Sequence, residues 1–353
     1  MEGVFGVRAD EEVMTPDPSQ NAIWVTRRVT RMKAQVLTAE TGPAGLELRD
    51  VETPTPAEGQ VLVDIKSCGI CFPDLLMSQG KYQLRMPTPF TPGTEVAGVV
   101  REAPEGASVK AGDKVLVASI VGGFAEQLVA SPEQLLPLPE GLTFDQGAAM
   151  GINYQTALFA LKIRAQTAPG EIVGVLGAAG GVGTASIMVA KAMGARVIAI
   201  VHRKGAEELL RGAGADEIVQ LEEGWGAKLR EYAPEGVDVM IDPSGGDVFD
   251  EALRQVAPDG RYVVIGFAAG GIPTVKLNRV LFRNIAVVGA AWGEYIRTHP
   301  GVPELLHDEL SEMIAAGLRP QVNTKYSLDQ LPQALTDLAE GRILGKAVVT
   351  IAD

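Results

Sequence analysis

The residues of this sequence best suited to chemistry form a glycine-rich turn, Gly177-Ala178-Ala179-Gly180-Gly181-Val182-Gly183. Residues 172–176 before the turn predict a buried strand, and residues 182–193 after it predict a helix. Ala178, Gly180 and Gly183 take the three positions at which a dinucleotide-binding turn needs small residues. A missing side chain lets backbone N–H groups reach a pyrophosphate, which then lies at the positive end of the helix. The residues predicted to hold it are Ala179, Gly180, Gly181 and Val182.

The end of the next predicted strand, residues 196–201, bears on which dinucleotide binds. An NAD site usually has an acidic residue there, about 20 residues after the glycines, to hold the ribose 2′-OH. This chain has His202-Arg203-Lys204 instead, and Arg203 stands 20 residues after Gly183. A guanidinium can pair bidentately with a 2′-phosphate. The pattern favours NADPH, held by Arg203 and Lys204, over a basic turn that only faces solvent.

Two cysteines, Cys68 and Cys71, and three histidines limit the metal and thiol chemistry. Two cysteines cannot make a four-thiolate zinc site or a disulfide framework, so we expect a reducing, cytoplasmic compartment. Their C-x-x-C spacing leaves redox chemistry as an alternative. The pair falls in a strand-to-loop region, however, and not at a helix N-terminus of a thioredoxin-like unit. We therefore expect Cys68 to be a core residue.

Length, composition and charge indicate the number of domains and the classes of partner. The chain has 353 residues, which suggests about two domains, and 46% of them are apolar, which fits a folded protein. The net charge is −13, and a nucleic-acid partner would need a basic face that this chain lacks. The longest strongly apolar stretch, residues 115–125, is too short to span a bilayer. We expect no nucleic-acid or membrane partner.

Two regions with different secondary-structure patterns follow one another along the chain. Residues 32–130 contain short β-rich segments between Gly and Pro turns, with one predicted helix at 72–79. Residues 144–161 predict a helix interrupted near 151–153, and apolar strands then alternate with helices, which predicts a parallel sheet covered on both faces. The strands are predicted at 172–176, 196–201, 237–242, 261–266 and 285–288, and the helices at 182–193, 205–213 and 247–256. The last part predicts helices at 303–316 and 328–340 and strands at 321–326 and 346–351. The fold class is α/β.

Residues 1–31 are mixed, acidic and Pro-bearing, and they lack the apolar core of a signal peptide. We expect a disordered N-terminal extension or an upstream start codon, with a targeting role as the alternative.

Motifs in sequence order show a resemblance to a known family. They are MKAQVL, the G-x-x-C-x-x-D at 69–74, PGTEVAGVV, GGFAEQLV, AAGGVG, the GAD at 214–216 and VVIGFAAGGIP. Residues 32–353 resemble the medium-chain dehydrogenase/reductase superfamily, in its zinc-independent NADPH:quinone oxidoreductase branch, which includes zeta-crystallin. The resemblance implies a GroES-like β-rich catalytic domain (32–155, returning at 296–353), a Rossmann domain (156–295) and an active site in the cleft. It also implies a homodimer in which sheet-edge strands pair, here at 285–291.

The resemblance locates the zinc ligands of the metal-dependent relatives. Cys71 stands at the first ligand position, but Thr94 stands where those relatives have histidine, followed by Glu95. The region 150–154 has no cysteine for the third ligand. One thiolate and a hydroxyl cannot hold zinc in a catalytic site, so we expect no metal. Cys71 is expected to contact the coenzyme instead.

Further site residues are implied only by the resemblance. Tyr82 matches a tyrosine that faces nicotinamide and substrate, and it either donates a proton to the substrate oxygen or only lines the pocket. Lys346, after Gly345, matches a coenzyme contact, with a solvated strand-edge lysine as the alternative. The residues expected near the nicotinamide are Thr156, Gly266 and Phe267. Asp74 is as compatible with a structural role as with a catalytic one. Ala206 and Leu221 replace a lysine and a tyrosine that often help at the adenosine phosphate, which places more weight on Arg203 and Lys204.

Together these features predict hydride transfer from NADPH to a small electrophile, a quinone first of all. The same step on an enone or enoyl-thioester C=C bond is the second interpretation. A non-catalytic NADPH-binding protein of the crystallin kind is the third.

Overall fold

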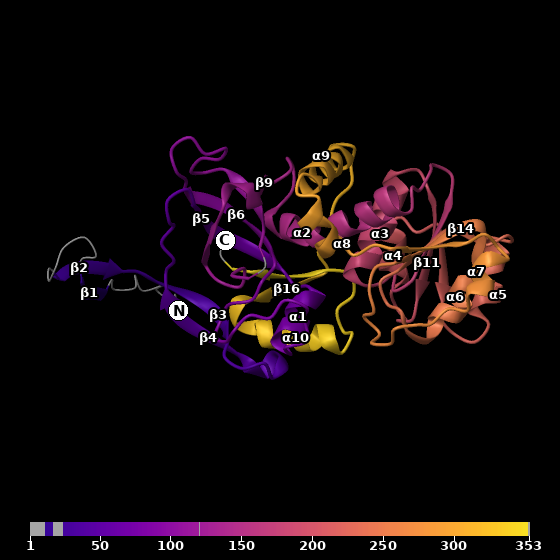
Figure 1. Cartoon of the computed structure of the whole chain (residues 1–353), viewed down its shortest axis with the longest axis horizontal. Coiled ribbons are helices and arrows are strands. Elements are labelled where there is room, and N and C mark those ends of the chain that lie inside the picture. The colour runs from indigo at the N-terminus through magenta and orange to yellow at the C-terminus, as the bar shows by residue number, and fades with distance from the viewer. Residues whose placement is uncertain (1–10, 17–23, 120, 352–353) are drawn as a thin grey trace. The chain divides into compact units, whose positions relative to one another are not determined.

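The computed structural model describes residues 11–16, 24–119 and 121–351, and the chain forms two compact units (Figure 1). Unit 1 is Met1–Pro137, Tyr326–Thr336 and Val349–Asp353, and unit 2 is Leu138–Lys325 and Asp337–Val348. The predicted domain boundaries differ from these, since residues 138–155, 296–325 and 337–348 fall in unit 2. The reason is that α2 (Phe144–Leu158) packs against α3 (Gly181–Ala192) and α9 (Val302–Ala315).

Unit 1 is β-rich. Its main sheet has the order β16-β17-β5-β6-β7-β9, with β8 also paired to β5, and β3 and β4 form a separate hairpin. Inward-facing residues of the central strand, such as Val61, Val63 and Ile65, are at most 1% exposed, which places the core against this sheet. The strands are β3 (Arg31–Leu37), β4 (Leu46–Glu52), β5 (Val61–Gly69), β6 (Glu95–Glu102), β7 (Lys114–Ala118), β8 (Gln127–Ala130), β9 (Leu135–Pro137), β16 (Thr324–Ser327) and β17 (Ala347–Thr350). The helices are α1 (Phe72–Ser78) and α10 (Leu331–Ala339).

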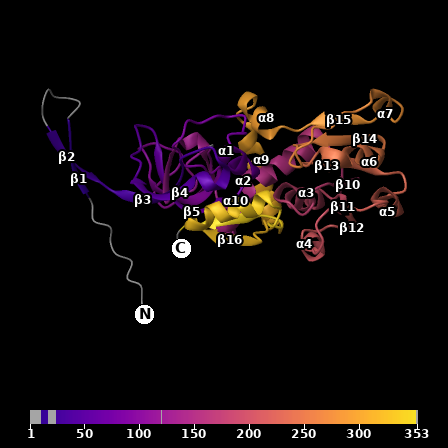
Figure 2. The same cartoon turned by 90° about the horizontal axis from the view of Figure 1, so that it is seen from below.

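Unit 2 contains a six-stranded, wholly parallel sheet in the order β12-β11-β10-β13-β14-β15, which Figure 2 shows strand by strand. The strands are β10 (Ile172–Val175), β11 (Arg196–Val201), β12 (Glu217–Gln220), β13 (Val237–Asp242), β14 (Val256–Val264) and β15 (Ala286–Gly289). The remaining helices are α4 (Glu207–Gly212), α5 (Trp225–Tyr232), α6 (Phe249–Arg254), α7 (Leu277–Leu281) and α8 (Trp292–Thr298). The central strands are buried because helices cover both faces, as all-parallel sheets require. This confirms the α/β class, with a GroES-like sheet and a Rossmann-type sheet.

The predicted interruption of the helix near residues 151–153 is wrong. α2 runs unbroken from Phe144 to Leu158 and continues as a π-helical segment, Phe159–Arg164. A glycine in a helix costs about 1 kcal/mol relative to alanine. Burial of Met150, Tyr154 and their neighbours in α2 outweighs that local preference.

The described part of the N-terminal extension contains two strands. β1 (Glu11–Pro16) and β2 (Trp24–Val29) pair as an antiparallel hairpin, which forms a sheet of its own. That the extension is disordered stays a prediction. The remaining part of the expectation, residues 1–10 and 17–23, lies outside the described residues.

In the described ranges, none of the helices combines the length and hydropathy needed to cross a membrane.

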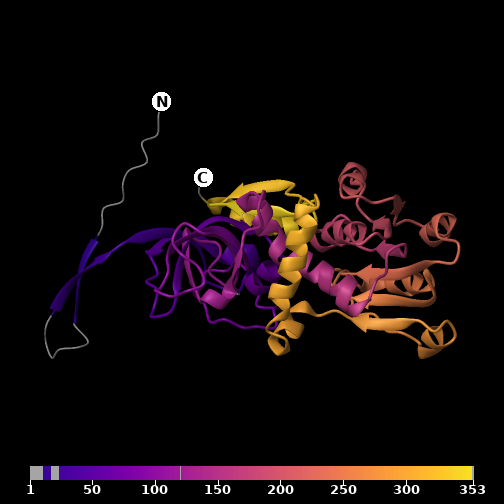
Figure 3. The same ribbon diagram turned by 90° about the horizontal axis from the view of Figure 1, so that it is seen from above.

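We propose that the protein is a homodimer through the β15 edge of the parallel sheet, which Figure 3 shows in orange beside α7. Val287 on this edge strand is 42% exposed, and the nearby Leu281 and Phe282 are 68% and 79% exposed. An unpaired apolar edge is a template for strand pairing. We expect light scattering at micromolar concentration to give about twice the 37.2 kDa of one chain.

The double substitution Leu281→Asp and Phe282→Asp is expected to reduce this mass to that of one chain. Leu305→Asp is the matched control, because Leu305 is 66% exposed on α9. A wild-type mass near 37.2 kDa would contradict the proposal.

Candidate functional site

The glycine turn has the shape that a pyrophosphate needs. It connects β10 to α3, whose N-cap is Gly180. A Cβ on Gly183 would lie 2.3 Å from the Gly177 carbonyl oxygen and 2.7 Å from the Ala178 Cα, so no side chain fits there. A Cβ on Gly180 would meet its nearest atom only at 3.4 Å, which leaves room above the turn. The first N–H groups of a helix have no intrahelical acceptor, and here they can bind the anion.

α2 contributes a residue that the sequence analysis missed. A Cβ on Gly181 would lie 2.5 Å from the Nδ2 of Asn153, so this amide lies directly against the turn. Asn153 is 8% exposed, and the predicted residue Thr156 is 5% exposed on the same helix. The sequence signal was a run of residues with polar groups, 153–156, after an apolar stretch of the same helix.

The C-terminal return segment also reaches the turn. The Gly345 N–H donates to the Ala179 carbonyl at 2.8 Å. Lys346 is 4% exposed, and its backbone N–H donates to the Asn323 Oδ1 at 3.2 Å. Burial raises the pKa of the neighbouring Tyr154 phenol well above its usual range, while the charge of Lys346 acts in the opposite direction. The alternative that Lys346 is a solvated strand-edge lysine is therefore wrong.

Arg203 follows β11 and is partly buried. Its Nη1 donates to the Ile343 carbonyl, and its guanidinium lies against Gly341. Burial lowers the pKa of this guanidinium, and within the described part of the chain no carboxylate forms an ion pair with it. A partly desolvated cation of this kind is suited to an anionic ligand. Lys204 is exposed beside it.

Gly266 and Phe267 lie in the loop after β14, and this loop is tied to the loop after β13. The Ala269 N–H donates to the Ser244 carbonyl at 2.9 Å, and a Cβ on Gly245 would lie 2.8 Å from the Phe267 ring. The turn and the predicted residues Thr156, Arg203, Lys346, Gly266 and Phe267 all belong to unit 2. Sequence analysis did not identify the role of the loop after β13.

Cys71 and Tyr82 belong to unit 1. Cys71 is the N-cap of α1, and its Sγ donates to the Glu95 Oε2 at 2.8 Å. The Asp74 carboxylate accepts the Cys71 N–H at 2.9 Å and is fully buried, which supports its structural role. Burial raises the pKa of the Cys68 thiol well above its usual range, so Cys68 stays protonated and a reactive C-x-x-C pair is disfavoured. Tyr82 is partly buried in the segment between α1 and β6.

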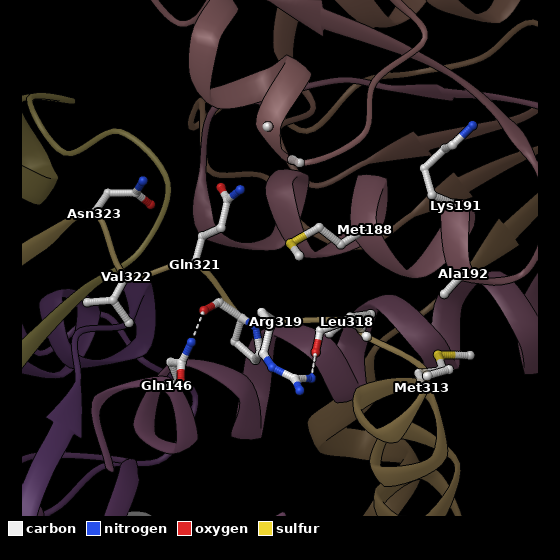
Figure 4. Close-up of a pocket in the computed structure, with 15 residues that line it drawn as sticks. Gln146, Met188, Lys191, Ala192, Met313, Leu318, Arg319, Gln321, Val322 and Asn323 are labelled. Atoms are coloured by element: carbon white, nitrogen blue, oxygen red, sulfur yellow. Dashed lines mark hydrogen bonds between the residues drawn. The ribbon is translucent and has the colours of Figure 1, made fainter. Parts of the chain in front are cut away.

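A pocket of about 840 Å³ opens in unit 2 beside the carboxyl-terminal half of α3 (Figure 4). Met188 and Lys191 of α3 line it opposite Arg319 and Gln321, and Lys191 is held by an ion pair with Asp216 at 2.9 Å. The lining includes none of the site residues predicted from sequence. The glycine turn lies at the other end of α3, but Asn323 of the pocket lining accepts the N–H of the predicted site residue Lys346.

The parallel sheet, its glycine turn and the order of the strands define a Rossmann-type dinucleotide-binding fold. Residues 57–140 match the alcohol dehydrogenase GroES-like domain, and residues 181–309 match the zinc-binding dehydrogenase family. The chain belongs to the medium-chain dehydrogenase/reductase superfamily, in its quinone oxidoreductase branch, and it is an oxidoreductase of that superfamily.

Three relatives illustrate the similarity. Quinone oxidoreductase-like protein 2 of Bos taurus is 36% identical over 308 residues, which cover 85% of this chain and 87% of that protein. The crystal structure of a probable oxidoreductase from Mycobacterium abscessus is 44% identical, with a TM-score of 0.85 over 91% of this chain and 99% of that one. The quinone oxidoreductase of Thermus thermophilus, solved also as its NADPH complex, is 35% identical, with a TM-score of 0.79 over 90% of this chain and all (100%) of that one.

The matching family is described as zinc-binding, so the residues at its zinc-ligand positions are compared with the needs of this metal. The residues at the ligand positions do not fit this metal, because Thr94 offers a hydroxyl in place of an imidazole and the Cys71 thiol is hydrogen bonded to Glu95. Among residues 11–16, 24–119 and 121–351, no three His, Cys, Asp or Glu side chains are grouped so that they could hold a metal.

We expect the purified protein to contain far less than one zinc per chain by elemental analysis. Incubation with EDTA is expected to leave its activity unchanged, because the side chains at positions 71 and 94 do not fit zinc. One zinc per chain together with loss of activity in EDTA would show that the ligands lie elsewhere.

Proposed function

We propose that this protein is an NADPH-dependent oxidoreductase that reduces a quinone. The single observation that carries the coenzyme choice is Arg203, a partly buried guanidinium that follows β11 in a stretch with no acidic residue. An acid there would repel a 2′-phosphate, whereas a guanidinium can pair with it. The quinone assignment is supported by the relatives named quinone oxidoreductase, at 35% identity, and quinone oxidoreductase-like protein 2, at 36% identity.

Bound NADPH would supply the hydride. The residues of this chain would supply binding and orientation: the glycine turn holds the pyrophosphate, Arg203 and Lys204 hold the 2′-phosphate, and Gly266 and Phe267 flank the nicotinamide. In this proposal the Tyr82 hydroxyl donates to the substrate oxygen that gains charge as the hydride arrives. Orientation and charge stabilisation suffice, because a quinone is already electrophilic.

Turnover measurements test the proposal. NADPH oxidation with 1,4-benzoquinone should be fast, and oxidation with 2-cyclohexenone should be slow. The reverse preference would favour a C=C reductase. NADPH binding without turnover on either acceptor would favour a non-catalytic binding protein.

A further inference from the structure

Asp242 stands at the carboxyl end of β13, beside the point where the order of the parallel strands reverses. β10 and β13 are neighbours in the sheet, although β11 and β12 lie between them in the sequence. In sheets of this kind the ligand crevice opens at that point, outside the carboxyl ends of the two strands. The loop after β10 is the glycine turn, and the loop after β13 is residues 243–246. Asp242 therefore stands at the base of one wall of the expected crevice.

The Asp242 carboxylate is 1% exposed and is held by three donors. Its Oδ1 accepts the N–H groups of Ser244 at 2.8 Å and Gly245 at 2.9 Å. Its Oδ2 accepts the Tyr262 hydroxyl at 2.7 Å. Burial and the adjacent carboxylate raise the pKa of the Tyr262 phenol well above its usual range, so this hydroxyl keeps its proton and donates. A buried carboxylate is costly unless donors compensate it in this way.

The loop held by Asp242 contacts the loops on both sides of it. A Cβ on Gly177 would lie 2.6 Å from the Ser244 Oγ, so the serine supports the glycine turn. Gly246 N–H donates to the Gly271 carbonyl at 3.0 Å, beyond Phe267 in the loop after β14. Gly245 adopts φ 62° and ψ −149°, a conformation that essentially only glycine adopts and that must be held in place.

We propose that Asp242, fixed by the Tyr262 hydroxyl, is a positioning residue that shapes the loop 243–246, and through it Phe267, to receive the nicotinamide half of the coenzyme. The inference rests on the proposed function, because it takes NADPH as the coenzyme. Asp242 holds the loop 243–246 in place before the coenzyme binds. Its effect is therefore on the preorganisation of the coenzyme site.

Asp242→Ala removes the acceptor for all three donors. We expect the Kd for NADPH, measured by coenzyme fluorescence, to rise by about tenfold or more. Binding of 2′-phospho-ADP-ribose, which lacks the nicotinamide, should change less than about twofold. Asp242→Asn retains an acceptor for the two amides and should restore most of the affinity. In the coenzyme-free protein, hydrogen exchange at the Ser244 and Gly245 amides should accelerate in Asp242→Ala.

Leu229→Ala controls for lost stability. Leu229 is fully buried on α5 in the same core cluster as Tyr262, so its truncation should lower the melting temperature and leave the Kd for NADPH unchanged. If Asp242→Ala does not fold, Tyr262→Phe removes one donor and should give the same pattern at about threefold.

Normal NADPH affinity in the variant that folds would overturn the inference. An equal loss of NADPH and of 2′-phospho-ADP-ribose would do so as well. Wild-type protein that binds neither ligand would instead overturn the proposed function itself.

Discussion

Replacing Arg203 with alanine is expected to raise the KM for NADPH by about ten- to a hundredfold and to leave the kinetics with NADH almost unchanged. A charge-assisted hydrogen bond contributes roughly 1.5–3 kcal/mol, and 1.4 kcal/mol corresponds to about tenfold in binding. The effect should fall towards the lower end if Lys204 compensates. It should also shrink with added salt, because the guanidinium is only partly buried. The measurement is kcat/KM for both coenzymes with one quinone.

Arg203 also donates to the Ile343 carbonyl, so alanine could disturb the return segment as well as the charge. Arg203→Gln helps to separate these effects, because it removes the charge and keeps an uncharged N–H donor on the side chain. We expect it to lose the preference for NADPH as alanine does. Lys204→Ala, at the exposed neighbour, should have a smaller effect. A wild type that prefers NADH, or a variant that loses both coenzymes equally, would refute the assignment of NADPH to Arg203.

Gly183→Ala is expected to weaken the binding of NADPH and NADH alike, by about a hundredfold. The added Cβ would lie 2.3 Å from the Gly177 carbonyl oxygen and 2.7 Å from the Ala178 Cα. Both are backbone atoms, so the turn itself must move. Overpacking of this kind costs roughly 1–3 kcal/mol, and the displaced turn also loses its alignment with the pyrophosphate, which both coenzymes share.

The matched control is Gly293→Ala in α8, where an added Cβ would meet no atom within 4 Å. Alanine is favoured over glycine in a helix by about 1 kcal/mol, so this variant should bind normally and melt no earlier than wild type. Coenzyme titrations by fluorescence and melting curves by circular dichroism make the comparison. Normal binding of both coenzymes by Gly183→Ala would show that the turn does not hold the pyrophosphate.

The parts of the site that could be predicted from sequence depend on short-range pattern. The turn before Gly183 and its flanking strand and helix occupy one continuous segment, so the residues and their order are enough to predict the geometry. The position of Arg203 just after β11 could also be predicted, because only one helix and one strand separate it from the glycine turn. Buried apolar strands likewise predict a parallel sheet wherever they alternate with helices.

The parts that could not be predicted depend on contacts between distant segments. Asn153 reaches the turn from α2, and Gly345 reaches Ala179 from the C-terminal return. The continuity of α2 is another case, because a local propensity disfavoured it and burial decided it. These contacts leave no local pattern in the sequence, because the residues that form them are far apart along the chain.

By itself the sequence determined the α/β class, the superfamily, the position of the dinucleotide turn and the basic residues that follow β11. Only the tertiary structure decided that Lys346 is buried, that Arg203 donates to the return segment and that Asp242 anchors the loop after β13. The physical reason is the range of the interactions involved. Periodicity and turn chemistry act over a few neighbouring residues, whereas desolvation and hydrogen bonding of a buried charge depend on whatever the complete fold packs around it.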